Sequence, residues 1–210
     1  MIFDPAWEAI HADRHWGSWP DEDLVRFVGR NYFRFHARHH FDFLDLGCGA
    51  GGNARFLATE GFSVTGIDGS KSAIERCFNW STSKSKRWMV APQFLVGDIT
   101  KLPPREFDCI IDICSIQHLS RDDRKIAVEA AADALKPKGR MFAKMLHFAS
   151  HGDLGAPDEP KAATVTSAEI HRIYSAFDFA LFNTQYQRAH PRLGGVKQTI
   201  KHYLIEAVKR

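Results

Sequence analysis

Apolar residues recur along the chain in two alternating patterns, which predict strands and helices in turn. Five short apolar runs are typical of strands buried in a sheet: 41–46, 62–68, 93–98, 106–115 and 139–146. Three segments between them carry apolar residues at helical spacing: 52–60, 70–80 and 121–136. Because strands separated by helices need crossover connections, we expect a mostly parallel sheet with helices on both faces.

The end of the chain breaks this alternation. A helix is predicted at 167–177, followed by strands at 178–187 and 199–208 with no helix between them. Two strands joined in this way pair antiparallel. The fold class is therefore predicted as α/β, with a doubly wound, mostly parallel, seven-stranded sheet and an antiparallel C-terminal strand.

Two helices are predicted ahead of the first strand, at 4–15 and 21–36. Pro20 and the acidic residues 21–23 are typical of a helix start, because proline fixes the backbone and negative charge suits the positive end of the helix dipole. We divide the chain into an N-terminal helical lid segment, 1–38, and one α/β domain, 39–210.

Composition narrows the class of protein. With 210 residues, 44% apolar and 25% charged, the chain is typical of one globular domain. A net charge of +3 is too small to indicate nucleic acid as a partner. Four cysteines without a C-x-x-C pair predict free thiols and a cytoplasmic location. We expect neither a secretory signal nor a membrane span, and the sequence does not indicate the oligomeric state.

Glycines and carboxylates follow the predicted strands, at the sheet edge where ligands of doubly wound folds bind. Gly47 and Gly49 follow the first strand, where they allow a tight turn and close approach to a ligand. Asp68 comes 21 residues after Gly47, which suits a carboxylate that accepts hydrogen bonds from a ribose. Asp98 and Ile99 suit the amino group and the ring face of adenine. Together they predict an adenosine cofactor.

Asp45 indicates which adenosine cofactor. A pyrophosphate binds backbone N–H groups and a helix N-terminus, and a carboxylate two residues before Gly47 would repel it. This disfavours a nicotinamide-dependent dehydrogenase. The same carboxylate suits the ammonium and sulfonium of S-adenosylmethionine.

At this point the chain resembles the class I (Rossmann-like) S-adenosylmethionine-dependent methyltransferases. The stretch LDLGCGAGGNARFLATEGFSVTGIDGS is similar to the first two motifs of that family. VGDITKLP, FDCIIDICSIQHL and ALKPKGRMF are similar to the next three, in order, so the resemblance covers roughly 41–146.

The resemblance implies an S-adenosyl-L-methionine site, and we expect no metal site. Asp45, Gly47 and Gly49 would hold the methionine end, and Asp68 the ribose. The remaining cofactor contacts are implied for residues at the next strand ends: Gly69 and Ser70 beside the ribose, Asp98 and Ile99 around the adenine, and Cys114 beside the cofactor.

His118, four residues past Cys114, is the candidate catalytic residue. Methyl transfer mainly requires alignment of the reacting atoms, but a hydroxyl nucleophile also benefits from a base. The alternative is that His118 only caps or packs its loop. Asp112, within the fourth strand, we interpret as a hydrogen-bonded buried carboxylate.

The acceptor is expected between two loops, 147–165 and 188–198, and an N-terminal wall that includes Trp16, Trp19 and Pro20. Arg188, His190, Arg192 and Lys197 favour an anionic small molecule, such as a carboxylate, a phosphate or a nucleotide-linked sugar. Arg188, Arg192 and Trp19 are the predicted substrate contacts. The alternative is a solvated surface loop.

Other interpretations stay open at this stage. His11 and His15 have the i, i+4 spacing of half a zinc site but no partner motif, so we expect them to be solvent-exposed. The basic stretch 81–88 (STSKSKRW) could touch nucleic acid, which would suit an RNA or tRNA methyltransferase, but the modest net charge disfavours it. A regulatory protein that binds the cofactor without catalysis would carry the same motifs.

Overall fold

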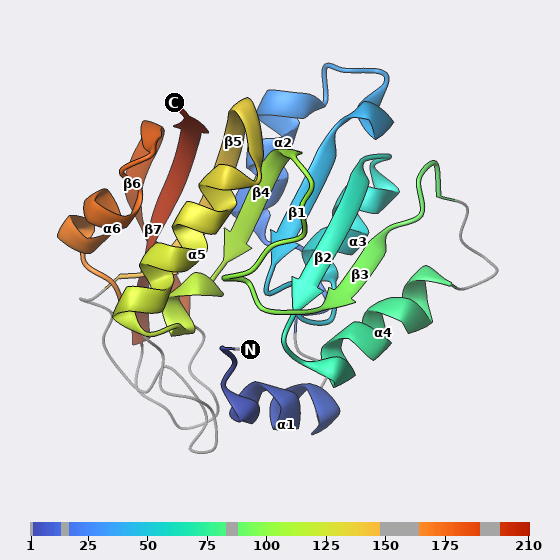
Figure 1. Cartoon of the computed structure of the whole chain (residues 1–210), viewed down its shortest axis with the longest axis horizontal. Helices are drawn as coiled ribbons and strands as arrows, with labels where there is room; N and C mark the ends of the chain where they lie inside the picture. Colours follow the sequence, from blue (N-terminus) through green and yellow to red (C-terminus); the bar gives the residue numbers. More distant parts are fainter. Residues whose placement is uncertain (1, 14–16, 83–87, 148–163, 190–197) are drawn as a thin grey trace.

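A seven-stranded sheet with helices on both faces organises the computed structural model (Figure 1). The structure describes residues 2–13, 17–82, 88–147, 164–189 and 198–210. The strand order is β3-β2-β1-β4-β5-β7-β6. The strands are β1 (Asp42–Leu46), β2 (Ser63–Asp68), β3 (Gln93–Val96), β4 (Phe107–Ile113), β5 (Leu135–Leu146), β6 (Phe177–Ala189) and β7 (Gln198–Lys209).

Strand directions confirm the predicted fold class. The five strands from β3 to β5 run parallel. β7 lies between β5 and β6 and is antiparallel to both. The carboxyl ends of the parallel strands therefore meet at one edge of the sheet, where the glycines and carboxylates of the sequence motifs come together.

Four of the α-helices, α2, α4, α5 and α6, begin at a side-chain cap. Asp21 caps α2 by accepting hydrogen bonds from the N–H groups of Asp23 and Leu24, and Ser70 caps α4 through the N–H of Ala73. The α-helices are α1 (Pro5–Asp13), α2 (Glu22–Tyr32), α3 (Gly52–Thr59), α4 (Lys71–Ser81), α5 (Arg121–Asp133) and α6 (Ser167–Ile173), and two 3-10 turns are η1 (Arg38–His40) and η2 (Ile116–His118). None of the helices in these ranges is long and apolar enough to cross a membrane.

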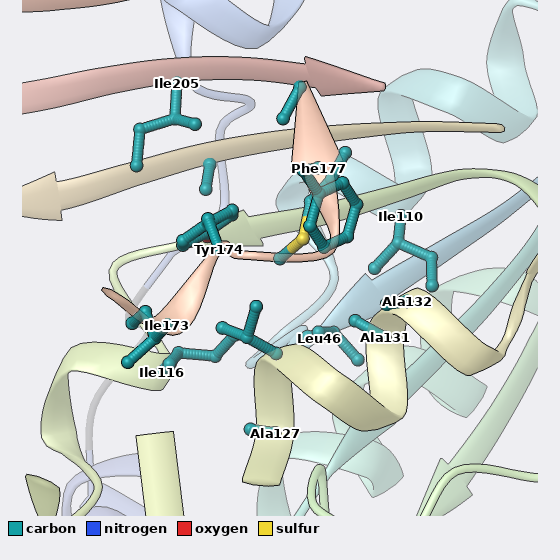
Figure 2. Packing of buried hydrophobic residues seen from close by; sticks show 14 of the residues in the cluster. Leu46, Ile110, Ile116, Ala127, Ala131, Ala132, Ile173, Tyr174, Phe177 and Ile205 are labelled. Atoms are coloured by element: carbon teal, nitrogen blue, oxygen red, sulfur yellow. The ribbon is translucent and has the colours of Figure 1, made fainter. Parts of the chain in front are cut away.

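Each face of the sheet has its own buried core. One core joins α2, α3 and α4 to the sheet and is rich in aromatic rings, such as Phe27 stacked on Phe142 at 4.7 Å between centroids. The other joins α5 and α6 to the opposite face. Figure 2 shows this second core, in which small side chains of α5, including Ala127 and Ala131, let the helix pack close to Leu46 on the sheet.

Several element boundaries differ from the prediction, most clearly those of β5, α6 and β6. β5 begins at Leu135, four residues before the expected start, because Leu135 already pairs with Phe107 across an irregularity in the ladder. α6 ends at Ile173 and β6 begins at Phe177, so the helix is shorter than the predicted 167–177. β6 also extends to Ala189, which places Arg188 in a strand, paired with Thr199, and not in a loop.

Candidate active site

A cavity of about 800 Å³ opens at the carboxyl ends of the parallel strands. This volume lies in the range of pockets that hold a small molecule. Its wall combines residues of the glycine loop, the ends of β2 and β4, η2, and the N-terminal segment. Figure 1 shows α1 lying across this edge of the sheet, beyond the arrowheads of β2 and β3.

The glycine turn after β1 fits against the turn after β4. Gly47 and Gly49 both have positive φ angles, 60° and 52°. A Cβ on Gly47 would lie 2.0 Å from the Oγ of Ser115, so no larger residue fits there. Both glycines line the cavity, as the sequence predicts for a loop that approaches a ligand.

Asp68 stands at the end of β2 on the cavity wall. Its Oδ2 accepts a hydrogen bond from the N–H of Gly49 at 2.8 Å, and its Oδ1 accepts one from the N–H of Ser70 at 2.8 Å. A carboxylate oxygen can accept a second hydrogen bond. Asp68 is therefore held in place by the backbone and still able to bind a hydroxyl.

Asp45 lies deeper than the residues that line the cavity. It is 1% exposed, its Oδ2 has no hydrogen-bond partner among the described residues, and it is absent from the cavity wall. Burial raises the pKa of Asp45 well above its usual range, and the Asp68 and Asp112 carboxylates raise it further. A cationic ligand group nearby would lower this pKa again and favour the charged carboxylate.

The carboxylate of Asp98 is held by the chain's own N-terminal segment. Its Oδ2 accepts from the N–H of Ile2 at 2.7 Å and its Oδ1 from Thr100. Phe3 packs on Gly69, where an added Cβ would lie 2.2 Å from the ring. Asp98 and Ser70 do not line the cavity, whereas Gly69, Ile99 and Cys114 do.

Helix α1 is fixed to the N-terminus of α4 by Glu8. One Glu8 oxygen accepts from the Oγ of Ser70 at 2.6 Å and the other from the Oγ of Ser72 at 2.6 Å. These bonds lower the pKa of Glu8, so it is charged at neutral pH. The helix brings Trp7 and His11 to the cavity wall. His11 is 4% exposed, so the expectation of a solvent-exposed side chain is wrong: α1 docks on α4 and buries it.

His118 lies on η2 and lines the cavity. Its ring packs edge-on against Trp7 at 4.9 Å between centroids, and its Nε2 is 3.4 Å from the Nε2 of Gln117. Gln117 is fixed in turn, since its Oε1 accepts from the N–H of Leu146 at 2.6 Å. Burial, and to a lesser degree the charge of Arg124, lowers the pKa of His118, so the imidazole is neutral at pH 7 and able to accept a proton.

Asp112 is a hydrogen-bonded buried carboxylate, as interpreted from the sequence. Its Oδ1 accepts from the N–H groups of Ser115 and Ile116 at 2.9 and 3.0 Å and so shapes the turn that carries His118. Burial raises the pKa of Asp112 to about 7. It does not line the cavity.

The other half of the cavity contains a buried cation that the sequence analysis missed. Lys144, near the end of β5, forms ion pairs with Asp21 at 2.9 Å and Asp23 at 3.0 Å at the start of α2. His202 of β7 is also on the wall, and burial, with a smaller effect of Lys144, lowers its pKa to about 4. A lysine inside the apolar run of β5 is the feature of the sequence that could have indicated this cluster.

The predicted substrate contacts are only partly described. Trp19 lines the cavity and is 87% exposed. Arg188 belongs to β6, but its side chain is not described, and Arg192 lies outside the described residues, as do Trp16, His15 and most of both predicted loops. In the ranges that the structure covers, no three His, Cys, Asp or Glu side chains are grouped so as to hold a metal ion.

Comparison with known proteins agrees with this geometry. Residues 43–139 match the family profile described as a methyltransferase domain. A ubiquinone biosynthesis O-methyltransferase from Idiomarina loihiensis is 29% identical over 104 residues, a match that spans 50% of this chain and 42% of that protein. An uncharacterized methyltransferase from Schizosaccharomyces pombe is 28% identical over 49% of this chain and 80% of its own length.

Solved structures share the fold at low sequence identity. TehB from Haemophilus influenzae has a TM-score of 0.73 at 18% identity, covering 97% of this chain and 67% of that one. A magnesium protoporphyrin IX methyltransferase from Synechocystis, solved with S-adenosylmethionine bound, has a TM-score of 0.67 at 18% identity, covering 90% and 77%. Residues 43–139 are therefore similar to a methyltransferase domain, and the whole sheet has the fold seen in a methyltransferase solved with S-adenosylmethionine.

Proposed function

We propose that the protein transfers a methyl group from S-adenosylmethionine to a small-molecule acceptor. The observation that carries this is one continuous cavity with two chemically different halves. The glycine turn and Asp68 line the half beyond β1 and β2, and Lys144 and His202 line the half at β5 and β7. His118 lies after β4, between them. A methyl donor and an acceptor bound in these halves would meet near Cys114, at the end of β4.

The residues of the first half fit the cofactor. Gly47 and Gly49 allow the backbone to approach it, Asp68 would accept hydrogen bonds from its ribose, and Asp45 would balance its positive charge. Gly69, Ser70, Asp98 and Ile99 would surround the adenosine once the N-terminal segment has moved from Asp98. When bound, the cofactor supplies a methyl group already activated by the sulfonium, so the protein mainly has to align the acceptor.

We assign His118 the role of general base for a hydroxyl acceptor. A neutral imidazole on the cavity wall, in contact with Gln117 and Trp7, supports this role. Replacement by glutamine keeps the ring's approximate size and polarity but removes its basicity. We expect kcat to fall roughly 100-fold or more while the Kd of the cofactor stays unchanged.

We further propose that the acceptor is anionic and is bound by Arg188 and Arg192. In the described part of the wall the lysine and arginine side chains, Lys144 and Arg26, are already ion-paired with acidic residues at the start of α2, so other cations would have to bind the acceptor. Arg188 follows Tyr186, which lines the cavity, by two positions in β6. If Arg188→Ala and Arg192→Ala leave the KM of the acceptor unchanged, this part of the proposal fails.

The test uses S-adenosylmethionine labelled in its methyl group. The purified protein is incubated with the small-molecule fraction and, separately, with the RNA fraction of a cell extract. Label in the small-molecule fraction supports the proposal. Label in RNA, with binding that weakens steeply with salt, identifies a nucleic-acid methyltransferase instead. Cofactor binding without transfer to either fraction favours a regulatory protein.

We also keep a reducing, cytoplasmic location as a proposal, since all four cysteines are free thiols.

A further inference from the structure

His11 lies on the wall of the main cavity, and the mechanism above gives it no role. Its side chain is 4% exposed, yet its Nδ1 has no hydrogen-bond partner among the described residues. A buried polar atom without a partner costs about 1–3 kcal/mol, and such atoms are rare in folded proteins. The imidazole on the cavity wall therefore has hydrogen-bonding capacity that the described residues leave unused.

His11 lies in the part of the cavity that contains Gly49 and Asp68. Its Cε1 lies 3.3 Å from the place where a Cβ on Gly49 would be, so the ring covers that glycine closely. The N–H of Gly49 donates to Asp68, and the Asp68 charge acts on the His11 imidazole. His11, Gly49 and Asp68 thus form one corner of the cavity, where the proposed ribose contact lies.

Helix α1 holds the ring in this corner without help from the ring itself. Glu8 bonds Ser70 and Ser72 near one end of the helix, and near the other end the guanidinium of Arg76 donates to the carbonyl of Ala12 at 3.2 Å. Both contacts come from α4. The position of His11 on the cavity wall is therefore set by helix docking and not by a hydrogen bond of its own ring.

The protonation state restricts the ligand group. Burial lowers the pKa of His11, and this outweighs the nearby Asp68 carboxylate, which raises it. At neutral pH the ring therefore has one nitrogen that donates and one that accepts. A hydroxyl can donate and accept, so it matches a ring nitrogen in either tautomer, whereas a carboxylate or an ammonium matches only one.

We propose that His11 is a cofactor-binding residue whose imidazole hydrogen-bonds a ribose hydroxyl of S-adenosylmethionine, in the same corner of the cavity as Asp68. The inference rests on the proposed position of the ribose at Asp68. It gives α1 a direct part in cofactor binding, beyond covering the cavity.

The experiment measures binding by calorimetry for S-adenosylhomocysteine and for its 2′-deoxy and 3′-deoxy analogues. Wild-type protein is compared with His11→Phe, which keeps a ring of similar size but removes both nitrogens, and with His11→Ala. In both variants we expect the Kd of S-adenosylhomocysteine to rise roughly three- to tenfold, the value of one hydrogen bond. For the analogue that lacks the hydroxyl bonded by His11, the Kd should hardly differ between wild type and variant. The ratio of its Kd to the Kd of S-adenosylhomocysteine should therefore be smaller in the variants than in the wild type.

Two further variants separate this role from simple packing. Glu8→Gln loosens α1 but keeps His11, and should weaken all three ligands by a similar factor. His36→Ala, at an exposed histidine, should change none of them. Equal weakening of all three ligands by His11→Phe, or unchanged binding, would overturn the proposal. If the wild-type protein bound none of the three ligands, the proposed cofactor site itself would fail, which is a distinct result.

Discussion

Replacing Asp112 by asparagine should change the free energy of unfolding relative to the wild type, and this difference should favour the variant more at pH 8 than at pH 5. The carboxyl is fully buried, and burial raises its pKa to about 7 from a reference value of 3.8. Asparagine keeps an oxygen that can accept from the N–H groups of Ser115 and Ile116, so the turn that carries His118 should be preserved. The substitution therefore acts mainly on charge.

The sign follows from proton linkage. Between pH 3.8 and about 7 the folded protein holds a proton on Asp112 that the unfolded chain has lost, so this residue makes the protein less stable as pH rises. The full penalty above pH 7 is roughly 4 kcal/mol, of which about 2–3 kcal/mol develops between pH 5 and pH 8. Asparagine does not titrate and carries no such penalty.

Urea unfolding followed by tryptophan fluorescence measures the effect. The free energy of unfolding is determined for wild type and Asp112→Asn at pH 5, 6, 7 and 8, and the difference between the two proteins is plotted against pH. We expect the free energy of unfolding of the variant, relative to that of the wild type, to rise by about 2–3 kcal/mol between pH 5 and pH 8. Asp122→Asn, on the surface of α5, should give a flat difference. A flat difference for Asp112→Asn as well would refute the reasoning.

Two other substitutions test the site more locally. Gly47→Ala should lower the free energy of unfolding by roughly 2–4 kcal/mol and weaken S-adenosylhomocysteine binding, because the φ of 60° disfavours alanine and its Cβ would meet Ser115. Urea unfolding measures the first effect and calorimetry the second. Wild-type values in both assays would contradict the turn geometry. Lys144→Met should cost about 3 kcal/mol or more by leaving Asp21 and Asp23 without their cation. Burial raises the pKa of Asp23 but Lys144 lowers it below its usual value, so the loss should be larger at pH 7 than at pH 4, and an equal loss would count against the ion pair.

Features that depend on neighbours in the sequence were predicted well. The alternation of apolar strands and helices gave seven strands, and residues at the strand ends came together at one edge of the sheet because parallel strands place them there. Gly47, Asp68 and His118 all line the cavity. The predicted helix starts at 21 and 70 agree with the observed caps Asp21 and Ser70, because capping is a local interaction.

Features that depend on docking between distant segments were not predictable. Helix α1 has little amphipathic pattern, and its place on α4 depends on Glu8 meeting two serines more than 60 residues away. The burial of His11 follows from that docking alone. Lys144 likewise gains its role from the start of α2, which lies 121 residues earlier in the chain at Asp23. The early start of β5 depends on a pairing with Phe107 that only the sheet reveals.

Binding of S-adenosylhomocysteine tests the central claim most directly. Isothermal calorimetry is carried out on wild type, Asp68→Ala and the surface control Asp122→Ala, with thermal unfolding to confirm that each is folded. The account predicts that wild type and the control bind with the same Kd, whereas Asp68→Ala loses at least tenfold in affinity, since a charged acceptor contributes about 1.5–3 kcal/mol per hydrogen bond. Undiminished affinity in a folded Asp68→Ala variant, or no binding to the wild type, would contradict it.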